Sequence, residues 1–292
     1  MIQKSLQEMT IKDTFMFYAV LNNPETCRKL LSRVLDMDIQ EVTVHGEDSI
    51  FYHPQFHGVR LDVIALEHET QRKFNVEMQV KRKGHLGRRS RYYHSQIDMD
   101  MLRAGKSYDE LPDAYVIFIC DFDPFGLGLY RYSFTMQCKE RELGLADGCK
   151  SIFLSTAGTN RSEISPELAE FLDYLSDPVV YDRSGDSLID QINDHVRQIK
   201  VDREWEDRYM LLYETLKEER AEGREEGRAE GRAEGRAEGR AEGRAEGRQD
   251  AFKELVIKKM AQLDDVAVIA EQLGLSKDLV EDLYREIKAE TR

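Results

Sequence analysis

The sequence of 292 residues is poor in cysteine, in long apolar runs and in net positive charge. Its four cysteines follow no Cys-x-x-Cys spacing, which indicates neither a zinc site nor a disulfide framework and fits a reducing cytosol. The longest apolar run, around Tyr115 to Cys120, is too short to cross a membrane, and the first residues lack the apolar core of a signal peptide. These absences predict a soluble cytosolic protein with no membrane partner.

The formal net charge of −14 argues against a surface that wraps nucleic acid everywhere. Residues 81–91 differ, because they contain six basic side chains and no acidic one. Such a cluster can neutralise a phosphate backbone, although by itself it would be better interpreted as a solvated loop. We therefore weigh it together with the segment that precedes it. Its candidate DNA-binding residues are Lys81, Arg82, Lys83, Arg88, Arg89 and Arg91.

That preceding segment has the pattern of two paired strands. Residues 59–66 are rich in β-branched and apolar side chains, a polar turn follows, and residues 73–80 alternate between apolar and polar side chains. On the second strand Glu77 and Gln79 lie on the face opposite the apolar side chains. A hairpin of this kind could place Asp62 beside Glu77.

Two neighbouring carboxylates would give the hairpin a chemical use. They repel each other, and a hard divalent cation relieves the repulsion by taking oxygen ligands from both. Mg²⁺ or Mn²⁺ bound to Asp62 and Glu77 can polarise a phosphate and generate a hydroxide nucleophile, while Gln79 could orient the attacking water. The competing interpretation is an exposed cross-strand charge pattern with nearby Lys or Arg. From the spacing alone the charge pattern is the favoured interpretation, and the family resemblance carried by the same residues makes the metal site the favoured one.

The same residues carry a family resemblance. Asp62, followed across a short hairpin by Glu77-Met78-Gln79, resembles the Asp…(Asp/Glu)-x-Lys signature of the PD-(D/E)XK nuclease superfamily. The strand Asn75–Gln79, with Arg91-Tyr92-Tyr93 and Gly105-x-x-Tyr108 downstream, is similar to the PD-(D/E)XK nuclease family transposases and the related recombination-promoting nucleases. The resemblance implies a bacterial, cytoplasmic endonuclease that uses Mg²⁺ or Mn²⁺ on DNA in recombination or transposition. It also implies that the main-chain carbonyl of Met78 is a further metal ligand.

The sequence departs from the superfamily pattern at two positions. Gln79 stands where lysine is usual, and Leu61 precedes Asp62 where the family name has proline. Lysine helps to stabilise charge at the phosphate, so glutamine implies slower chemistry or a different way of placing the water. Proline is not a ligand, and the metal site does not depend on it.

Further residues have two open interpretations each. Asp13 is a possible outer metal ligand, although a place in a first helical turn, where its charge suits the helix dipole, is favoured. On a helix predicted for residues 88–103, Tyr92 and Gln96 share a face that can contact phosphates, and a structural role suits Tyr92 equally well. Asp121 and Asp123 could form a second metal site, but a turn before Pro124 is favoured.

The predicted order α–β–β–β–α–β gives an α/β fold, a restriction-endonuclease-like core whose mixed central sheet is flanked by helices. Helices are expected within residues 10–36, after Ser165 and over residues 186–219, and a buried central strand over residues 113–121. We predict four regions. They are a nuclease-like domain (1–200), a helical extension (201–221), an Ala-Glu-Gly-Arg repeat (222–248) and a helical tail (249–292).

The repeat places a glycine at every fourth residue, seven in all. Each costs a helix about 0.8–1 kcal/mol relative to alanine, and like charges recur at i,i+4. We favour a flexible spacer of partial helicity over a self-associated helical bundle. In the tail, Ala270, Gly274 and Val280 have the spacing of a helix-turn-helix, but the acidic second helix suits protein interaction or dimerisation better than DNA. The repeat and tail are thus a possible route to a homo-oligomer.

The sequence therefore supports two functions of different classes. The favoured one is a metal-dependent DNA endonuclease, and the alternative is a catalytically inactive DNA-binding or self-associating scaffold protein. RNA is a weaker substrate candidate, because no module rich in stacking aromatics is present.

Overall fold

In the computed structural model the described residues are 4–46, 49–50, 59–60, 63–82, 84–102, 104–180, 185–262 and 265–290. The chain divides into two compact units, Met1–Leu212 and Tyr213–Arg292. Asp62, Lys83 and Leu61, all named in the sequence predictions, lie outside the described residues.

The first unit is built on a six-stranded mixed sheet in the order β1-β4-β5-β6-β8-β7. β5 runs parallel to β6, and β6 runs parallel to β8, while the remaining neighbours are antiparallel. A separate pair, β2 (Ser49–Ile50) and β3 (Val59–Arg60), forms a second, two-stranded sheet. The strands of the main sheet are β1 (Val42–Gly46), β4 (Val63–Glu67), β5 (Lys73–Gln79), β6 (Ala114–Cys120), β7 (Arg131–Phe134) and β8 (Cys149–Ser155).

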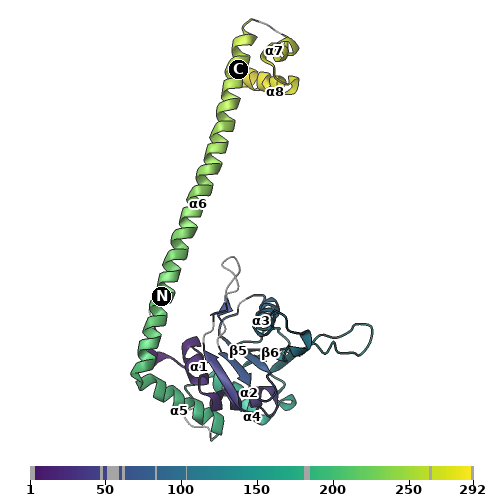
Figure 1. Cartoon of the computed structure of the whole chain (residues 1–292). Coiled ribbons are helices and arrows are strands. Elements are labelled where there is room, and N and C mark those ends of the chain that lie inside the picture. Colours follow the sequence, from purple (N-terminus) through teal and green to yellow (C-terminus); the bar gives the residue numbers. More distant parts are fainter. Residues whose placement is uncertain are drawn as a thin grey trace. The chain divides into compact units, whose positions relative to one another are not determined.

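Helices cover both faces of this sheet (Figure 1). The apolar side chains Phe74, Val76 and Met78 of β5 join a large core with α1, α2, α4 and α5, whereas Val116 and Phe118 of β6 pack with α3. This arrangement confirms the predicted α/β core with a mixed sheet. The helices are α1 (Thr14–Leu21), α2 (Pro24–Leu35), α3 (Leu86–Met101), α4 (Pro166–Ser176) and α5 (Ser187–Val201), with 3₁₀ turns at Leu6–Glu8, Tyr108–Glu110 and Arg161–Glu163.

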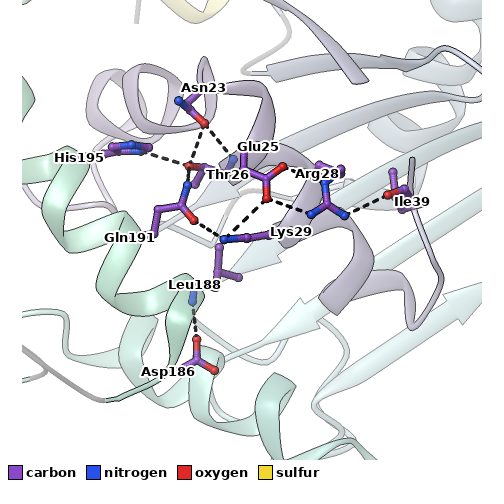
Figure 2. Close-up of polar contacts among 10 residues, drawn as sticks. All are labelled: Asn23, Glu25, Thr26, Arg28, Lys29, Ile39, Asp186, Leu188, Gln191 and His195. Carbon is purple, nitrogen blue, oxygen red and sulfur yellow. Dashed lines mark hydrogen bonds and ion pairs between the residues drawn. The ribbon is translucent and has the colours of Figure 1, made fainter. Parts of the chain in front are cut away.

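Polar side chains join α2 to α5 (Figure 2). We call Asn23, Thr26, Lys29, Gln191 and His195 the α2–α5 network. Thr26 is fully buried, and its hydroxyl lies 3.2 Å from Asn23 Oδ1 and 3.1 Å from His195 Nδ1. Gln191 donates to that hydroxyl at 3.0 Å and accepts from Lys29 at 2.8 Å. The network thus fixes the first turn of α2 against the middle of α5.

The ends of two predicted elements differ from the structure. Residues 59–66 were predicted as one strand, but Val59–Arg60 pairs with β2 and Val63–Glu67 pairs with β1 and β5. Residues 186–219 were predicted as one helix, but α5 ends at Val201. Asp202 is extended and its carboxylate accepts from the backbone of Glu204 at 2.8 Å, so a capping side chain interrupts the helix there.

The 58-residue helix α6 (Arg203–Met260) contains the whole glycine repeat. The sequence argument favoured a spacer of partial helicity, so a continuous helix is a departure from that expectation. Alanine, glutamate and arginine, which occupy the other positions, are all strong helix formers.

The second unit has a small core of its own where α6, α7 (Val266–Leu273) and α8 (Lys277–Glu290) meet. Ile269, Ala270 and Val280 are buried in it, and Gly274 ends α7 in the left-handed region with φ 65°. Among the described helices, none combines the length and apolar character needed to cross a membrane.

Candidate active site

The polar side chains of β5 lie together on the face of the sheet that α3 covers. We call Lys73, Asn75, Glu77 and Gln79 the β5 polar face. In the parallel register Asn75 pairs with Val116 and Glu77 with Phe118, and both partners belong to the α3-side core. All four polar side chains are buried, with Glu77 only 2% exposed. The alternation predicted from the sequence is therefore present, and it carries charge into the interior.

A pocket of about 650 Å³ opens at the carboxyl end of β5. Among the described residues four cationic side chains and two carboxylates line it, so this part of the lining is basic although the chain is acidic. A basic pocket at the end of a buried strand is suited to an anionic ligand such as phosphate. The lining residues are Lys4, Thr10, Lys12, Asp13, Thr14, Glu77, Met78, Gln79, Val80, Lys81 and Arg89.

Arg89, in the first turn of α3, connects the two functional candidates of β5. Its Nη2 lies 3.1 Å from Glu77 Oε2, and its Nη1 donates to Gln79 Oε1 at 2.8 Å. It also donates to the Tyr93 hydroxyl at 2.7 Å, and its guanidinium lies 5.3 Å from the Phe118 ring centroid. The charged group is thereby held by hydrogen bonds and ring contacts at the edge of the pocket.

Both polar atoms of the Gln79 side chain have partners. Oε1 accepts from Arg89, while Nε2 donates to the main-chain carbonyl of Met78 at 3.1 Å. These contacts determine which end of the carboxamide faces Arg89. The same carbonyl of Met78 is the one that the family resemblance implied as a metal ligand.

Asn75 differs from its neighbours on the strand. It is completely buried, and neither Nδ2 nor Oδ1 has a hydrogen-bond partner in the described part of the chain. An unpaired buried carboxamide costs about 1–3 kcal/mol of stability. Such a cost is unusual in the middle of a sheet, and it falls on the β5 polar face two residues before Glu77.

The N-terminal segment also lines the pocket. Asp13 is the N-cap residue of α1 and lines the pocket; its carboxylate accepts from Lys4 Nζ at 2.6 Å and from the backbone of Thr10 at 2.8 Å. Lys12 pairs with Asp121 at 2.5 Å. Lys4 and Lys12 were not predicted, and no local signal in the sequence would have found them, because only the fold brings them to β5.

The predicted DNA-binding residues divide into two groups. Lys81 and Arg89 line the pocket, while Arg88 and Arg91 are exposed on α3 outside its lining. Arg82 is exposed too, and it donates to the main-chain oxygen of Asp123 at 2.9 Å and lies over Phe122. Tyr92 and Gln96 are half-buried on α3, where Tyr92 packs against the α3-side core.

Asp123 has the environment of a turn, which was the favoured interpretation. Its carboxylate accepts from the backbone of Phe125, Gly126 and Gly128 and from the Tyr132 hydroxyl. Burial raises the pKa of Asp123, but these hydrogen bonds outweigh it and hold the pKa at about 2. The carboxylate is therefore occupied in shaping the loop after β6.

The donors at this end of β5 are hard oxygen atoms, which suit Mg²⁺ or Mn²⁺ rather than zinc. Among the described residues no cluster of three His, Cys, Asp or Glu side chains could hold a metal. Asp62, the second predicted carboxylate ligand, is outside that set. Val63, which follows Asp62 in the chain, pairs with Val76, which precedes Glu77.

A family model described as PD-(D/E)XK nuclease family transposase matches residues 16–214. The matched segment contains the β5 polar face and Arg89, while Lys12 and Asp13 precede it and the repeat follows it. No curated protein and no solved structure matches the chain. Because the match covers more than half of the 292 residues, the chain belongs to the PD-(D/E)XK nuclease family transposases.

Proposed function

We propose that the protein is a metal-dependent endonuclease that hydrolyses phosphodiester bonds of DNA during recombination or transposition. The observation that carries this proposal is the buried carboxylate of Glu77 at the end of β5, within a pocket lined by Lys4, Lys12, Lys81 and Arg89. A carboxylate among cations in a basic pocket is the combination that metal-assisted phosphate chemistry requires.

Asp62, Glu77 and the main-chain carbonyl of Met78 are the residues that would hold Mg²⁺ or Mn²⁺. Such an ion, when bound, polarises the phosphate and lowers the pKa of a bound water. The supporting facts are the hard oxygen donors at β5 and the strand register, in which the neighbours of Asp62 and Glu77 in the chain pair with each other.

The other residues of the pocket would bind and orient the substrate. Lys81 is exposed and lies two residues after the end of β5, so it is placed to attract a phosphate of the backbone. Exposed Arg88 and Arg91 would neutralise neighbouring phosphates outside the pocket. The burial of Glu77 reduces screening by water, which strengthens each electrostatic interaction at the reacting phosphate.

One observation favours the alternative of an inactive DNA-binding protein. Glu77 already has an ion pair with Arg89, and such a pair can stabilise a site that has lost its chemistry. The two functions differ in the need for metal. DNA binding by an inactive scaffold would depend on its basic residues and would not require the carboxylates.

Plasmid nicking by the purified full-length protein separates these functions. Wild type is compared in Mg²⁺, Mn²⁺ and EDTA with Asp62→Ala and Glu77→Ala, each checked for folding by circular dichroism. We expect metal-dependent nicking that falls by on the order of 10³-fold or more in both variants, because each removes a proposed metal ligand.

The matched control is Asp173→Ala, which removes the α4 carboxylate from a surface ion pair with Arg161 outside the pocket lining and should leave nicking unchanged. Absence of nicking by wild type with every divalent metal, together with unchanged DNA binding in both variants, would overturn the endonuclease and support the scaffold.

A further inference from the structure

We propose that Arg89 supplies the positive charge that stabilises the reacting phosphate, and that Gln79 is the residue that positions Arg89. This inference rests on the proposed nuclease function and concerns the same pocket. It gives Gln79 a role different from the placement of water, which the sequence suggested.

Arg89 has the contacts that such a role needs. Its guanidinium contacts Glu77, Gln79 and the hydroxyl of Tyr93, and it lies 5.4 and 5.3 Å from the ring centroids of Tyr93 and Phe118. The side chain lines the pocket and is 27% exposed. It is therefore held rigidly by the protein and can still be reached by a ligand, as preorganised stabilisation of charge requires.

The other described cations of the pocket are placed less well. Lys4 is bound to the carboxylate of Asp13, and Lys12 is bound to Asp121 and to the main-chain oxygen of Ser176. Lys81 is exposed and follows the end of β5, which suits attraction of DNA better than fixed contact with one phosphate. Arg89 contacts both Glu77 and Gln79.

The Arg89 contact also explains why glutamine is compatible with position 79. Oε1 of Gln79 accepts from Arg89 at 2.8 Å while Nε2 is fixed on the carbonyl of Met78. A lysine at this position would place an ammonium beside the guanidinium, and two like charges at this distance repel strongly. A neutral hydrogen-bond acceptor at position 79 is therefore compatible with the cation at position 89, whereas a second cation would be repelled by it.

During hydrolysis, water adds to phosphorus and the bond from phosphorus to the leaving sugar oxygen breaks. The proton released by the water passes to that oxygen or to solvent, and negative charge accumulates on the non-bridging phosphate oxygens. Arg89 would donate N–H groups to one of these oxygens. Its guanidinium keeps its protons throughout, because arginine is not deprotonated in proteins.

A charge swap tests this assignment. Arg89→Gln, Gln79→Lys and the double variant Arg89→Gln/Gln79→Lys are compared with wild type in nicking, thermal unfolding and DNA affinity in EDTA. We expect each single variant to lose about 10²–10³-fold in nicking, since each removes or displaces the cation. The nicking activity of the double variant should be at least about tenfold higher than that of either single variant. The ammonium introduced at position 79 then lies beside a neutral side chain at position 89.

Arg161→Gln is the matched control, because it removes an arginine from a surface pair with Asp173. Thermal unfolding should show Gln79→Lys less stable than wild type and the double variant partly restored. Higher activity of Gln79→Lys alone would overturn the proposal, as would a double variant no better than the single ones. If wild type does not nick DNA, the nuclease function fails separately. DNA affinity in EDTA then tests whether Arg89 contacts phosphate. Equal loss of affinity in Arg89→Gln and Arg161→Gln would overturn the proposal.

Discussion

Two polar clusters of the first unit, each with a fully buried side chain, invite comparison, the α2–α5 network around Thr26 and the β5 polar face with Asn75. In the α2–α5 network the buried hydroxyl of Thr26 contacts Asn23, Gln191 and His195 (Figure 2). On the β5 polar face the carboxamide of Asn75 is equally buried, yet it has no hydrogen-bond partner within the described part of the chain. Among the described residues the buried hydroxyl of Thr26 has hydrogen-bond partners and the buried carboxamide of Asn75 has none.

This difference distinguishes polar side chains that stabilise the fold from polar side chains that we propose serve function. A buried cluster whose central group is hydrogen-bonded helps to fix helices in one arrangement at little cost. On the β5 polar face, the buried carboxamide without a partner among the described residues lowers stability, and an ion pair beside it lines the basic pocket. A strand with a purely structural role would not be expected to carry this cost. We therefore expect substitutions in the two clusters to have opposite effects on stability and activity.

The largest stability effect is expected from Thr26→Val in the α2–α5 network. Valine preserves the shape but removes the hydroxyl, which leaves the Gln191 donor and its neighbours short of a partner. Unfolding free energy should fall by about 1–3 kcal/mol, as measured by urea denaturation. Nicking per folded molecule should not change.

Thr26→Ser is the matched control, because it retains the hydroxyl and removes only a methyl group. It should lose about 1 kcal/mol or less. Equal destabilisation by serine and valine would show that packing, rather than hydrogen bonding, makes Thr26 important.

A smaller effect of opposite sign is expected for Asn75→Val. Valine suits a buried strand and removes the unpaired carboxamide, so the protein should gain about 1–2 kcal/mol in the same denaturation assay. Nicking should decrease, because the substitution changes the β5 polar face two residues from Glu77. An Asn75→Val variant that is both less stable and fully active would contradict the functional assignment of the β5 polar face.

The smallest effect concerns pH and His195. Burial lowers the pKa of His195 in the folded protein and outweighs the opposing charge of Asp194, so folding favours the neutral ring. This contribution to stability is complete above the ordinary histidine pKa near 6.5, and it is lost as pH falls through the lower folded value. The Tm of wild type should therefore fall more between pH 7 and pH 5 than that of His195→Gln.

His94, whose pKa burial also lowers, contributes equally in wild type and in the His195→Gln variant, so the difference between them reports His195. An identical pH dependence in the two proteins would show that His195 titrates as freely in the folded chain as in the unfolded one.

The sequence predicted the part of the site that one strand encodes. Alternation along residues 73–80 placed Glu77 and Gln79 on one face, and the structure agrees because β5 lies in the middle of the sheet. The apolar run at residues 113–121 likewise predicted the buried central strand β6. Periodicity carries such information because both faces of a central strand are decided by burial.

The remaining features depend on contacts between distant residues. The pairing of Arg89 with Gln79 joins a helix to a strand, and Lys12 reaches the pocket from the N-terminal segment. Neither pairing has a local pattern. The prediction for the repeat differed from the structure for another reason. The low helix propensity of glycine argued against a continuous helix, whereas α6 runs through the repeat. In the described structure a Cβ added at Gly231 or Gly239 would meet no atom within 4 Å apart from the adjacent residues and backbone of its own helix, so alanine would fit there.

The most direct test of the central claim is the binding of Mn²⁺ to the full-length protein, followed by electron paramagnetic resonance. We expect a Mn²⁺ site in wild type that is lost in Glu77→Ala and retained in Thr26→Ser, whose substitution lies in the α2–α5 network. Equal binding by wild type and Glu77→Ala, or no binding by wild type at millimolar Mn²⁺, would contradict the assignment of the β5 polar face as a metal-dependent active site.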